Sequence, residues 1–272
     1  MPYVTASDGT RIFYREYGEG RPIVFSHGWP LNGDAWDGQM LFLANNGFRV
    51  VAHDRRGHGR SDQPAAGNDM DHYADDLGAV LDTLDLNDAV LVGHSTGGGE
   101  IAHYVGRHGT ARVGKMVFIG AVVPLMKQGP TNPDGLPQAV FDGIRKSVLD
   151  NRSGFYLSFP DVFFGFDKGV PKDEGFRYAF WQQGMAGGAH GQYECVEQFS
   201  GVDFTDDLKA IDVPVLIVHG DADDIVPIDI TARRAAEIIA DATLKVYEGA
   251  PHAVPTICQD RLNADLLAFA RS

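Results

Sequence analysis

Hydrophobic residues in this chain form short continuous runs separated by longer amphipathic stretches. Six runs rich in Val and Ile, at 22–26, 49–53, 89–93, 115–120, 214–219 and 243–247, have the pattern of strands covered on both faces. Before them, Val4 and the run 11–15 lie on either side of an Asp-Gly pair at positions 8 and 9, which is typical of a β-hairpin turn. The pattern predicts a hairpin followed by a mostly parallel, eight-stranded sheet.

Apolar residues recur at helical spacing between and after these runs. The three clearest stripes are Leu77-Val80-Leu81-Leu84, Ile228-Ala232-Ala235-Ile239 and Leu262-Leu266-Phe269. Alternation of strand and helix predicts an α/β fold with helices on both faces of the sheet. Parallel sheets of this kind carry their chemistry at the carboxyl ends of the strands.

The alternation stops after Pro124. The segment 124–208 is rich in Pro, Gly and aromatic residues, and we interpret it as a helical cap inserted over the carboxyl edge of the sheet. Most of its aromatic side chains are expected to form a core private to the cap. Residues 1–123 and 209–272 would then form one core domain, as suits a chain of 272 residues.

Composition narrows the range of partners. The formal net charge is −14, and no basic cluster is longer than Arg55-Arg56, which argues against a nucleic-acid partner. Neither a signal-peptide pattern nor an apolar run of membrane-spanning length is present, so we expect no membrane partner. Cys195 and Cys258 lack metal-site spacing and are expected to be free thiols in a reducing cytoplasm. The expected protein is cytoplasmic and holds no metal.

A polar residue follows the run 89–93 at the point where the next helix should begin. Gly93-His94-Ser95-Thr96-Gly97 matches G-x-S-x-G between a strand and a helical stripe, which makes Ser95 the candidate nucleophile. Glycines on both sides would allow a sharp turn, and the helix N-terminus would point its free N–H groups towards the serine. The alternative, a serine N-cap in a tight turn, explains neither glycine.

A serine hydroxyl needs a base and an acid to react. His252 follows the last predicted strand and is the candidate base. Asp221, Asp223 and Asp224 all follow the run 214–219; their spacing favours Asp223 as the acid, with Asp224 second. The order Ser, Asp, His is that of α/β-hydrolases.

Two backbone N–H groups are candidates for the oxyanion hole. Gly28 permits a turn that directs the N–H of Trp29 inwards, and the N–H of Thr96 stands at the helix start. His27 is expected to brace this loop through side-chain hydrogen bonds. His94, beside the nucleophile, either contacts substrate or packs, and Pro30, after the oxyanion residue, is a second candidate for substrate binding.

Together these motifs resemble the α/β-hydrolase superfamily, and within it the cofactor-free branch of haloperoxidases (non-heme chloroperoxidases), aryl esterases and perhydrolases. The resemblance rests on 27–29, 54–61, 93–100, 220–227 and 250–252. It implies Ser95 as nucleophile, His252 as base and Asp223 as acid, with Trp29 and Thr96 holding the oxyanion. Members often carry Met at the position of Thr96 and Phe at that of His94.

The resemblance also implies a reaction. Ser95 would attack a small ester or a carboxylic acid, and water or hydrogen peroxide would accept the acyl group without any cofactor. With peroxide the product is a peracid, which oxidises halide away from the protein. Members of the branch often form homo-oligomers. We interpret the rigid Pro30 as favouring perhydrolysis over hydrolysis.

Other functions remain open at this stage. A lactonase, an amidase or a carbon–carbon bond hydrolase could use the same triad, because cap residues decide the substrate. A ligand receptor that keeps the triad is a further alternative. Dehalogenases and epoxide hydrolases with an aspartate nucleophile are disfavoured, because position 95 is serine.

Overall fold

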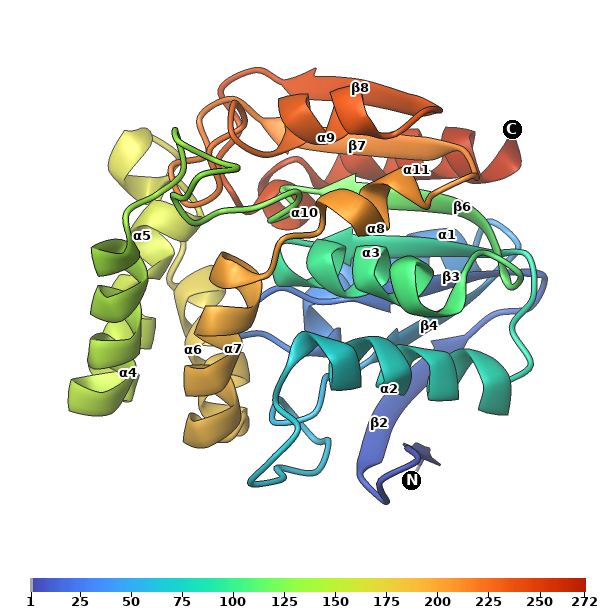
Figure 1. Cartoon of the computed structure of the whole chain (residues 1–272), viewed down its shortest axis with the longest axis horizontal. Coiled ribbons are helices and arrows are strands. Elements are labelled where there is room, and N and C mark those ends of the chain that lie inside the picture. The colour runs from blue at the N-terminus through green and yellow to red at the C-terminus, as the bar shows by residue number, and fades with distance from the viewer. Residues whose placement is uncertain (1) are drawn as a thin grey trace.

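The computed structural model describes residues 2–272 and contains one eight-stranded sheet (Figure 1). The strand order is β1-β2-β4-β3-β5-β6-β7-β8. β1 pairs antiparallel with β2, and β2 with β4, while the remaining neighbours are parallel. The strands are β1 (Tyr3–Thr5), β2 (Arg11–Tyr17), β3 (Arg21–Ser26), β4 (Phe48–His53), β5 (Ala89–His94), β6 (Val113–Ile119), β7 (Val215–Gly220) and β8 (Ala242–Tyr247).

Every strand that the hydrophobic runs predict is present, with ends shifted by no more than two residues. All six residues of β5 and all six of β7 are buried, which explains why these strands read as continuous apolar runs and not as alternating ones. The predicted α/β fold with a mostly parallel sheet is confirmed.

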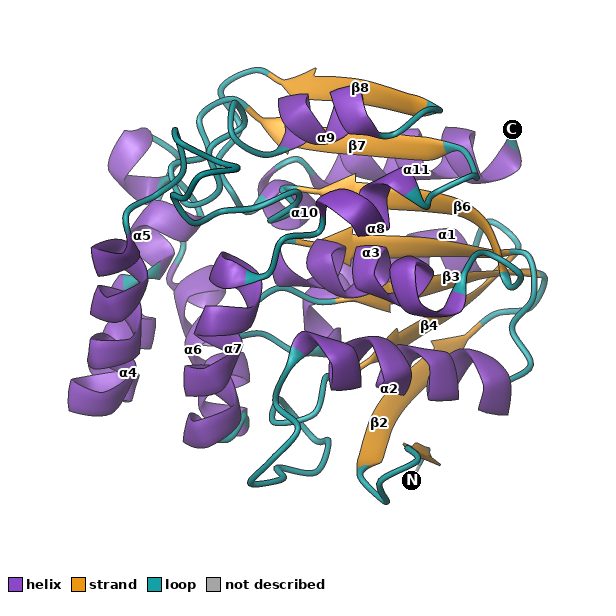
Figure 2. Cartoon of the chain, viewed as in Figure 1, coloured by secondary structure: helices purple, strands orange, loops and turns teal. Residues whose placement is uncertain are grey.

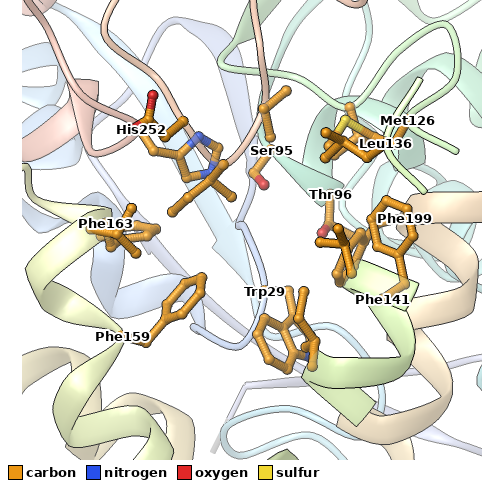
Figure 3. A pocket seen from close by; sticks show the side chains of 17 residues that line it. Trp29, Ser95, Thr96, Met126, Leu136, Phe141, Phe159, Phe163, Phe199 and His252 are labelled. Carbon is orange, nitrogen blue, oxygen red and sulfur yellow. The ribbon is translucent and has the colours of Figure 1, made fainter. Parts of the chain in front are cut away.

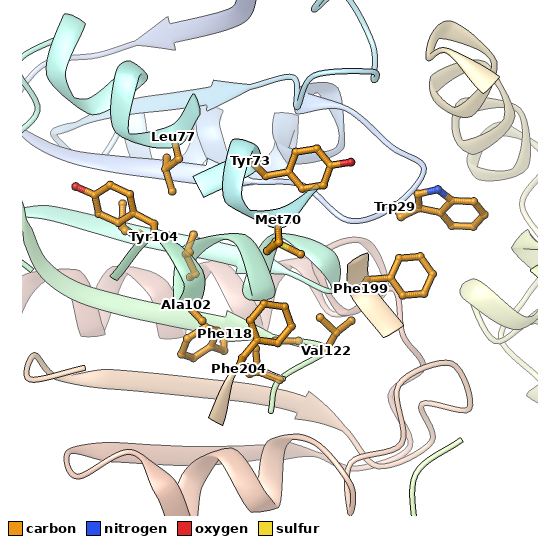
Figure 4. Packing of buried hydrophobic residues seen from close by; sticks show 14 of the residues in the cluster. Trp29, Met70, Tyr73, Leu77, Ala102, Tyr104, Phe118, Val122, Phe199 and Phe204 are labelled. Atoms are coloured by element: carbon orange, nitrogen blue, oxygen red, sulfur yellow. The ribbon is translucent and has the colours of Figure 1, made fainter. Parts of the chain in front are cut away.

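Helices cover both faces of the sheet (Figure 2). One hydrophobic cluster packs α2, α3, α8 and α9 on one face, and a second packs α1, α10 and α11 on the other. Figure 4 shows part of the first cluster, which includes Leu77 of α2, Ala102 of α3 and Phe118 of β6. The bounds are α1 (Asp37–Ala44), α2 (Met70–Thr83), α3 (Thr96–His108), α8 (Thr205–Lys209), α9 (Ala232–Ile238), α10 (Val254–Ile257) and α11 (Gln259–Arg271).

Helix α9 is shorter than its apolar stripe suggests. Ile228 lies in a turn before the helix, where the Thr231 hydroxyl donates to the carbonyl of Pro227 at 2.7 Å, and Ile239 already has extended backbone angles. Both isoleucines are nevertheless buried. The helical spacing therefore marks buried positions correctly, but it overestimates the helix at each end.

The segment 124–208 contains the helices α4 (Gln138–Ser158), α5 (Pro160–Phe163), α6 (Glu174–Ala186) and α7 (Ala189–Gly201), which gather at one end of the sheet (Figure 1). Their aromatic side chains do not form a separate core: Phe141, Tyr156 and Phe199 belong to the same cluster as Trp29 and Val122 of the sheet loops. The division into a core domain and a cap stays a prediction. None of the helices within 2–272 is long and apolar enough to span a membrane.

A buried carboxylate ties the sheet to the helix that follows Ser95. Glu100 of α3 is fully buried and accepts hydrogen bonds from Ser26 Oγ at 2.9 Å, His53 Nε2 at 2.7 Å and Arg55 Nε at 2.6 Å. Arg55 in turn donates through Nη2 to the carbonyl of His27 at 2.8 Å, and its backbone N–H donates to His27 Nε2 at 3.0 Å. The network thus joins β3, β4, α3 and the loop after β3.

This network generates a stability prediction for Glu100→Gln. The change leaves the buried guanidinium of Arg55 without its counter-charge, so the free energy of unfolding should fall by about 3 kcal/mol. Burial alone would raise the pKa of Glu100, but Arg55 and His53 lower it to about 2. A group with a depressed folded-state pKa stabilises above its ordinary value, here 4.5, and loses that contribution as the pH falls towards 2.

Urea unfolding at pH 7 and at stepwise lower pH tests both statements. The matched control is Glu194→Gln, which removes one partner of a partly exposed Arg–Glu pair at 3.4 Å from Arg145 and should cost under about 1 kcal/mol. Equal losses in the two variants, or a difference that does not shrink on acidification, would contradict the assignment.

Candidate active site

Ser95 occupies a strained turn between β5 and α3. Its φ of 54° lies in the left-handed region that non-glycine residues seldom adopt, at a cost of about 1–3 kcal/mol. A Cβ at Gly97 would collide with the carbonyl of Ser26, and one at Gly93 with the backbone of Gly97. Within the described chain, Ser95 makes no side-chain capping hydrogen bond to α3. The turn therefore presents the hydroxyl of Ser95 instead of using it as an N-cap.

His252 and Asp223 meet at the carboxyl edge of the sheet. His252 lies in the loop after β8, and its Nδ1 donates to Asp223 Oδ2 at 2.7 Å. The other carboxylate oxygen of Asp223 accepts from the backbone N–H groups of Ile225 at 2.9 Å and Val226 at 2.8 Å. A proton on Nδ1 leaves Nε2 as the basic nitrogen of His252. Ser95 lies beside this imidazole in Figure 3.

The surroundings of Asp223 favour its ionised form. Burial alone would raise its pKa, but His252 and His219 hold the pKa below its ordinary value through charge and hydrogen bonding. Asp224, the second candidate from the sequence, instead forms an ion pair with Lys168 at 2.5 Å. The structure thus brings Asp223, and not Asp224, to the histidine.

Trp29 and Thr96 line the same cavity as Ser95. A Cβ at Gly28 would stand 3.2 Å from the Cβ of Ser95, so the loop after β3 passes close to the nucleophile. Thr96 is the first residue of α3, where backbone N–H groups have no partner inside the helix. This placement suits the two predicted oxyanion N–H groups, whose role stays a prediction.

His27 braces the loop after β3, as its position in the sequence predicts. Its Nδ1 bonds the carbonyl of Gly28 at 2.9 Å, and its Nε2 accepts from the backbone N–H of Arg55 at 3.0 Å. Burial lowers the pKa of His27 well below its ordinary value, so the ring is neutral and suited to accept that second hydrogen bond.

A cavity of about 340 Å³ opens in front of Ser95 and His252 (Figure 3). Most of its walls are apolar side chains from α4, α5, α7 and the loops of the sheet, and Asp224 on its wall is already paired with Lys168. Such a lining favours an apolar ligand, which would lie next to Ser95, Thr96 and the imidazole of His252. Within residues 2–272, no group of three or more His, Cys, Asp or Glu side chains is arranged to hold a metal ion.

His94 and Pro30 do not line this cavity. Nε2 of His94 bonds the backbone carbonyl of His252 at 3.1 Å, and its ring lies on a second, much smaller cavity of about 20 Å³. Burial and the neighbouring His252 lower the pKa of His94 to about 3, so the ring is neutral. The carbonyl of Pro30 accepts from Gln192 Nε2 at 3.3 Å. For His94 the structure shows packing against the loop of His252, and for Pro30 a contact with Gln192; substrate binding by either residue stays a prediction.

Gln192 is a structural residue of the site that the sequence did not reveal. It is fully buried on α7, and its backbone carbonyl accepts from Trp29 Nε1 at 2.9 Å. Its side chain accepts from the Tyr156 hydroxyl at 2.9 Å and donates to the Gly184 carbonyl at 2.7 Å. Gln192 therefore joins α7 to the loop after β3, and no motif or spacing marks it.

Comparison with known proteins agrees with this architecture. A family model described as the alpha/beta hydrolase fold matches residues 21–255. A non-heme haloperoxidase of Rhodococcus erythropolis is 57% identical over 274 residues, and a bifunctional esterase/perhydrolase of Acinetobacter calcoaceticus is 51% identical over 276; each alignment covers 100% of both chains. The crystal structure of a bromoperoxidase from Bacillus anthracis superimposes with a TM-score of 0.95 at 34% identity, over 100% of both chains.

The family match spans most of the chain, and the relatives align along its whole length at more than half identity. The fold, the G-x-S-x-G turn and the order of the candidate residues agree with that match. The chain is therefore a hydrolase-type enzyme that belongs to the alpha/beta-hydrolase family, in the branch of the non-heme haloperoxidases and esterase/perhydrolases.

Proposed function

We propose that this enzyme cleaves small carboxylic esters through an acyl-enzyme on Ser95 and passes the acyl group to water or to hydrogen peroxide. One observation carries the proposal. A histidine held by a buried carboxylate at 2.7 Å stands beside a serine in a strained strand-to-helix turn, at the wall of an apolar cavity. These are the parts that nucleophilic acyl transfer needs.

The first half-reaction forms the acyl-enzyme. Asp223 holds the Nδ1 proton of His252, so Nε2 takes the proton of Ser95 as Oγ bonds to the ester carbonyl carbon. The carbonyl oxygen becomes an oxyanion, which accepts from the backbone N–H groups of Trp29 and Thr96. When the oxyanion collapses, the bond to the alcohol breaks and His252 returns the proton to the leaving oxygen.

The second half-reaction frees Ser95. Water or hydrogen peroxide gives a proton to His252 as its oxygen attacks the acyl carbon, and Ser95 Oγ leaves with that proton. Water yields a carboxylic acid and peroxide yields a peracid, which then oxidises bromide or chloride in solution. The esterase/perhydrolase of Acinetobacter calcoaceticus and the haloperoxidase of Rhodococcus erythropolis support both acceptors by their names. Neither half-reaction uses a cofactor; cytoplasmic location and a homo-oligomer stay predictions.

The triad assignment predicts unequal losses of turnover with phenyl acetate. Ser95→Ala should lower kcat by about 10⁶-fold and Asp223→Asn by about 10⁴-fold, because the first removes the nucleophile and the second favours the wrong tautomer of His252. Asp224→Asn is the matched control, since that carboxylate pairs with Lys168, and it should stay within a few-fold of the parent.

The measurement is the initial rate of hydrolysis of phenyl acetate by one preparation of each variant. A lactone and an amide are tested as substrates in the same way. Turnover that survives Ser95→Ala overturns the proposed function. A loss of kcat in Asp224→Asn as large as that in Asp223→Asn would contradict the assignment of Asp223 alone as the acid.

Pro30 generates a second prediction, about the choice of acceptor. Proline fixes φ and lacks an N–H, and here its carbonyl is also held by Gln192, so the loop after Trp29 is rigid. Pro30→Leu should lower the ratio of peracid formation to ester hydrolysis several-fold. Both rates are measured on the same enzyme with and without hydrogen peroxide, and Pro171→Leu, at an exposed proline of the cap, is the control. An unchanged ratio in Pro30→Leu refutes the role of loop rigidity.

A further inference from the structure

The side-chain hydroxyl of Thr96 has no hydrogen-bond partner among residues 2–272, although Thr96 is fully buried. A buried hydroxyl without a partner lowers the stability of the fold. Thr96 follows the nucleophile directly and lines the cavity. An unpaired polar atom at this place requires an explanation, since most buried polar groups in proteins are satisfied.

The chain itself offers this hydroxyl little to bond. A threonine inside a helix commonly bonds a carbonyl of the preceding turn, but Thr96 is the first residue of α3 and has no such turn before it. Figure 3 shows Thr96 between Ser95 and the rings of Phe141 and Phe199. The cavity wall on that side is apolar, so a bound ligand is the natural partner.

We propose that the Thr96 hydroxyl donates a third hydrogen bond to the carbonyl oxygen of the ester as that oxygen becomes an oxyanion. The inference rests on the proposed function. The N–H and the hydroxyl of Thr96 are carried by the amide nitrogen and by Cβ, both bonded to the same Cα, so a χ1 rotamer that sets them gauche lets both reach one oxygen. Both then stand beside the oxygen on which negative charge develops.

A donor of this kind should act mainly on the transition state. A neutral ester carbonyl is a weak acceptor, whereas the oxyanion is charged and accepts strongly. The hydroxyl should therefore raise kcat and leave KM nearly unchanged. The unpaired hydroxyl should also lower the stability of the free enzyme, so removing it without changing the shape should not destabilise the fold.

Two substitutions at Thr96 separate these effects. Thr96→Val keeps the backbone N–H and the branched shape but removes the hydroxyl, and kcat with phenyl acetate should fall about 10- to 100-fold with KM within two-fold. Thr96→Ser keeps the hydroxyl, and its kcat should stay within about three-fold of the parent. Binding of phenylboronic acid, whose adduct with Ser95 resembles the tetrahedral intermediate, should weaken in Thr96→Val by about the same factor as kcat.

Thermal unfolding of the same variants provides the second readout. Thr96→Val should melt at or above the parent, whereas Thr96→Ser, which loses a buried methyl group, should melt below it. Activity and stability would then rank the two variants in opposite orders. The matched control is Thr231→Val: Thr231 is equally buried, but its hydroxyl donates to Pro227 at 2.7 Å, so this variant should lose stability and keep kcat.

Each other outcome counts against the proposal. An unchanged kcat in Thr96→Val, or equal losses in Thr96→Val and Thr96→Ser, would show that the hydroxyl makes no such contact while the serine mechanism stands. A lower melting temperature for Thr96→Val would show that the hydroxyl has a structural partner. Failure of the proposed function is recognised separately, by turnover that persists in Ser95→Ala.

Discussion

Glu100 is buried on the helix that begins after Ser95, and its carboxylate accepts from side chains at the ends of β3 and β4 and from Arg55 beyond β4. A buried charge is tolerated only with several well-placed partners, so these segments can pack against α3 in very few ways. Arg55 also donates to the carbonyl of His27, so the same network restricts the position of the loop after β3. The buried ionic contact between Glu100 and Arg55 thus links the helix that follows Ser95 to the loop that carries Trp29.

The glycines around Ser95 impose the second constraint. At Gly93 and Gly97 a Cβ would collide with backbone, and at Gly98 one would collide with Ala121 of the loop after β6. α3 can therefore press against the sheet only because these side chains are missing. That contact holds the left-handed backbone of Ser95, which would be unfavourable without it. Local strain at the nucleophile is balanced by close packing on both sides of it.

Features that depend on local pattern could be predicted from the sequence, and features that depend on tertiary contacts could not. The apolar runs locate all eight strands, and the turn at Gly93–Gly97 with its partners in the loops after β7 and β8 locates the candidate residues. The stripe from Ile228 to Ile239 misplaces the ends of α9, because turns can bury residues at helical spacing too. Gln192 belongs to no motif, and its hydrogen bond with Trp29 depends on the packing of α7 against the loop after β3. For His94, the sequence left contact and packing open, and the ring packs against the loop of His252.

Strained and buried polar groups lie close together at the carboxyl edge of the sheet. Ser95 has an unfavourable φ, Thr96 has a buried hydroxyl without a partner, and Asp223 keeps an ionised carboxylate out of water. The first two cost folding free energy, and Ser95 and Thr96 both line the cavity. Elsewhere, the two hydrophobic clusters and the Glu100 network supply the stability that offsets these costs. Strain alone does not locate the site, because Asp85 and Asp88 also have positive φ and buried atoms such as Trp36 Nε1 also lack a partner within the described chain. Ser95 and Thr96 differ from these residues because both line the same apolar cavity as His252.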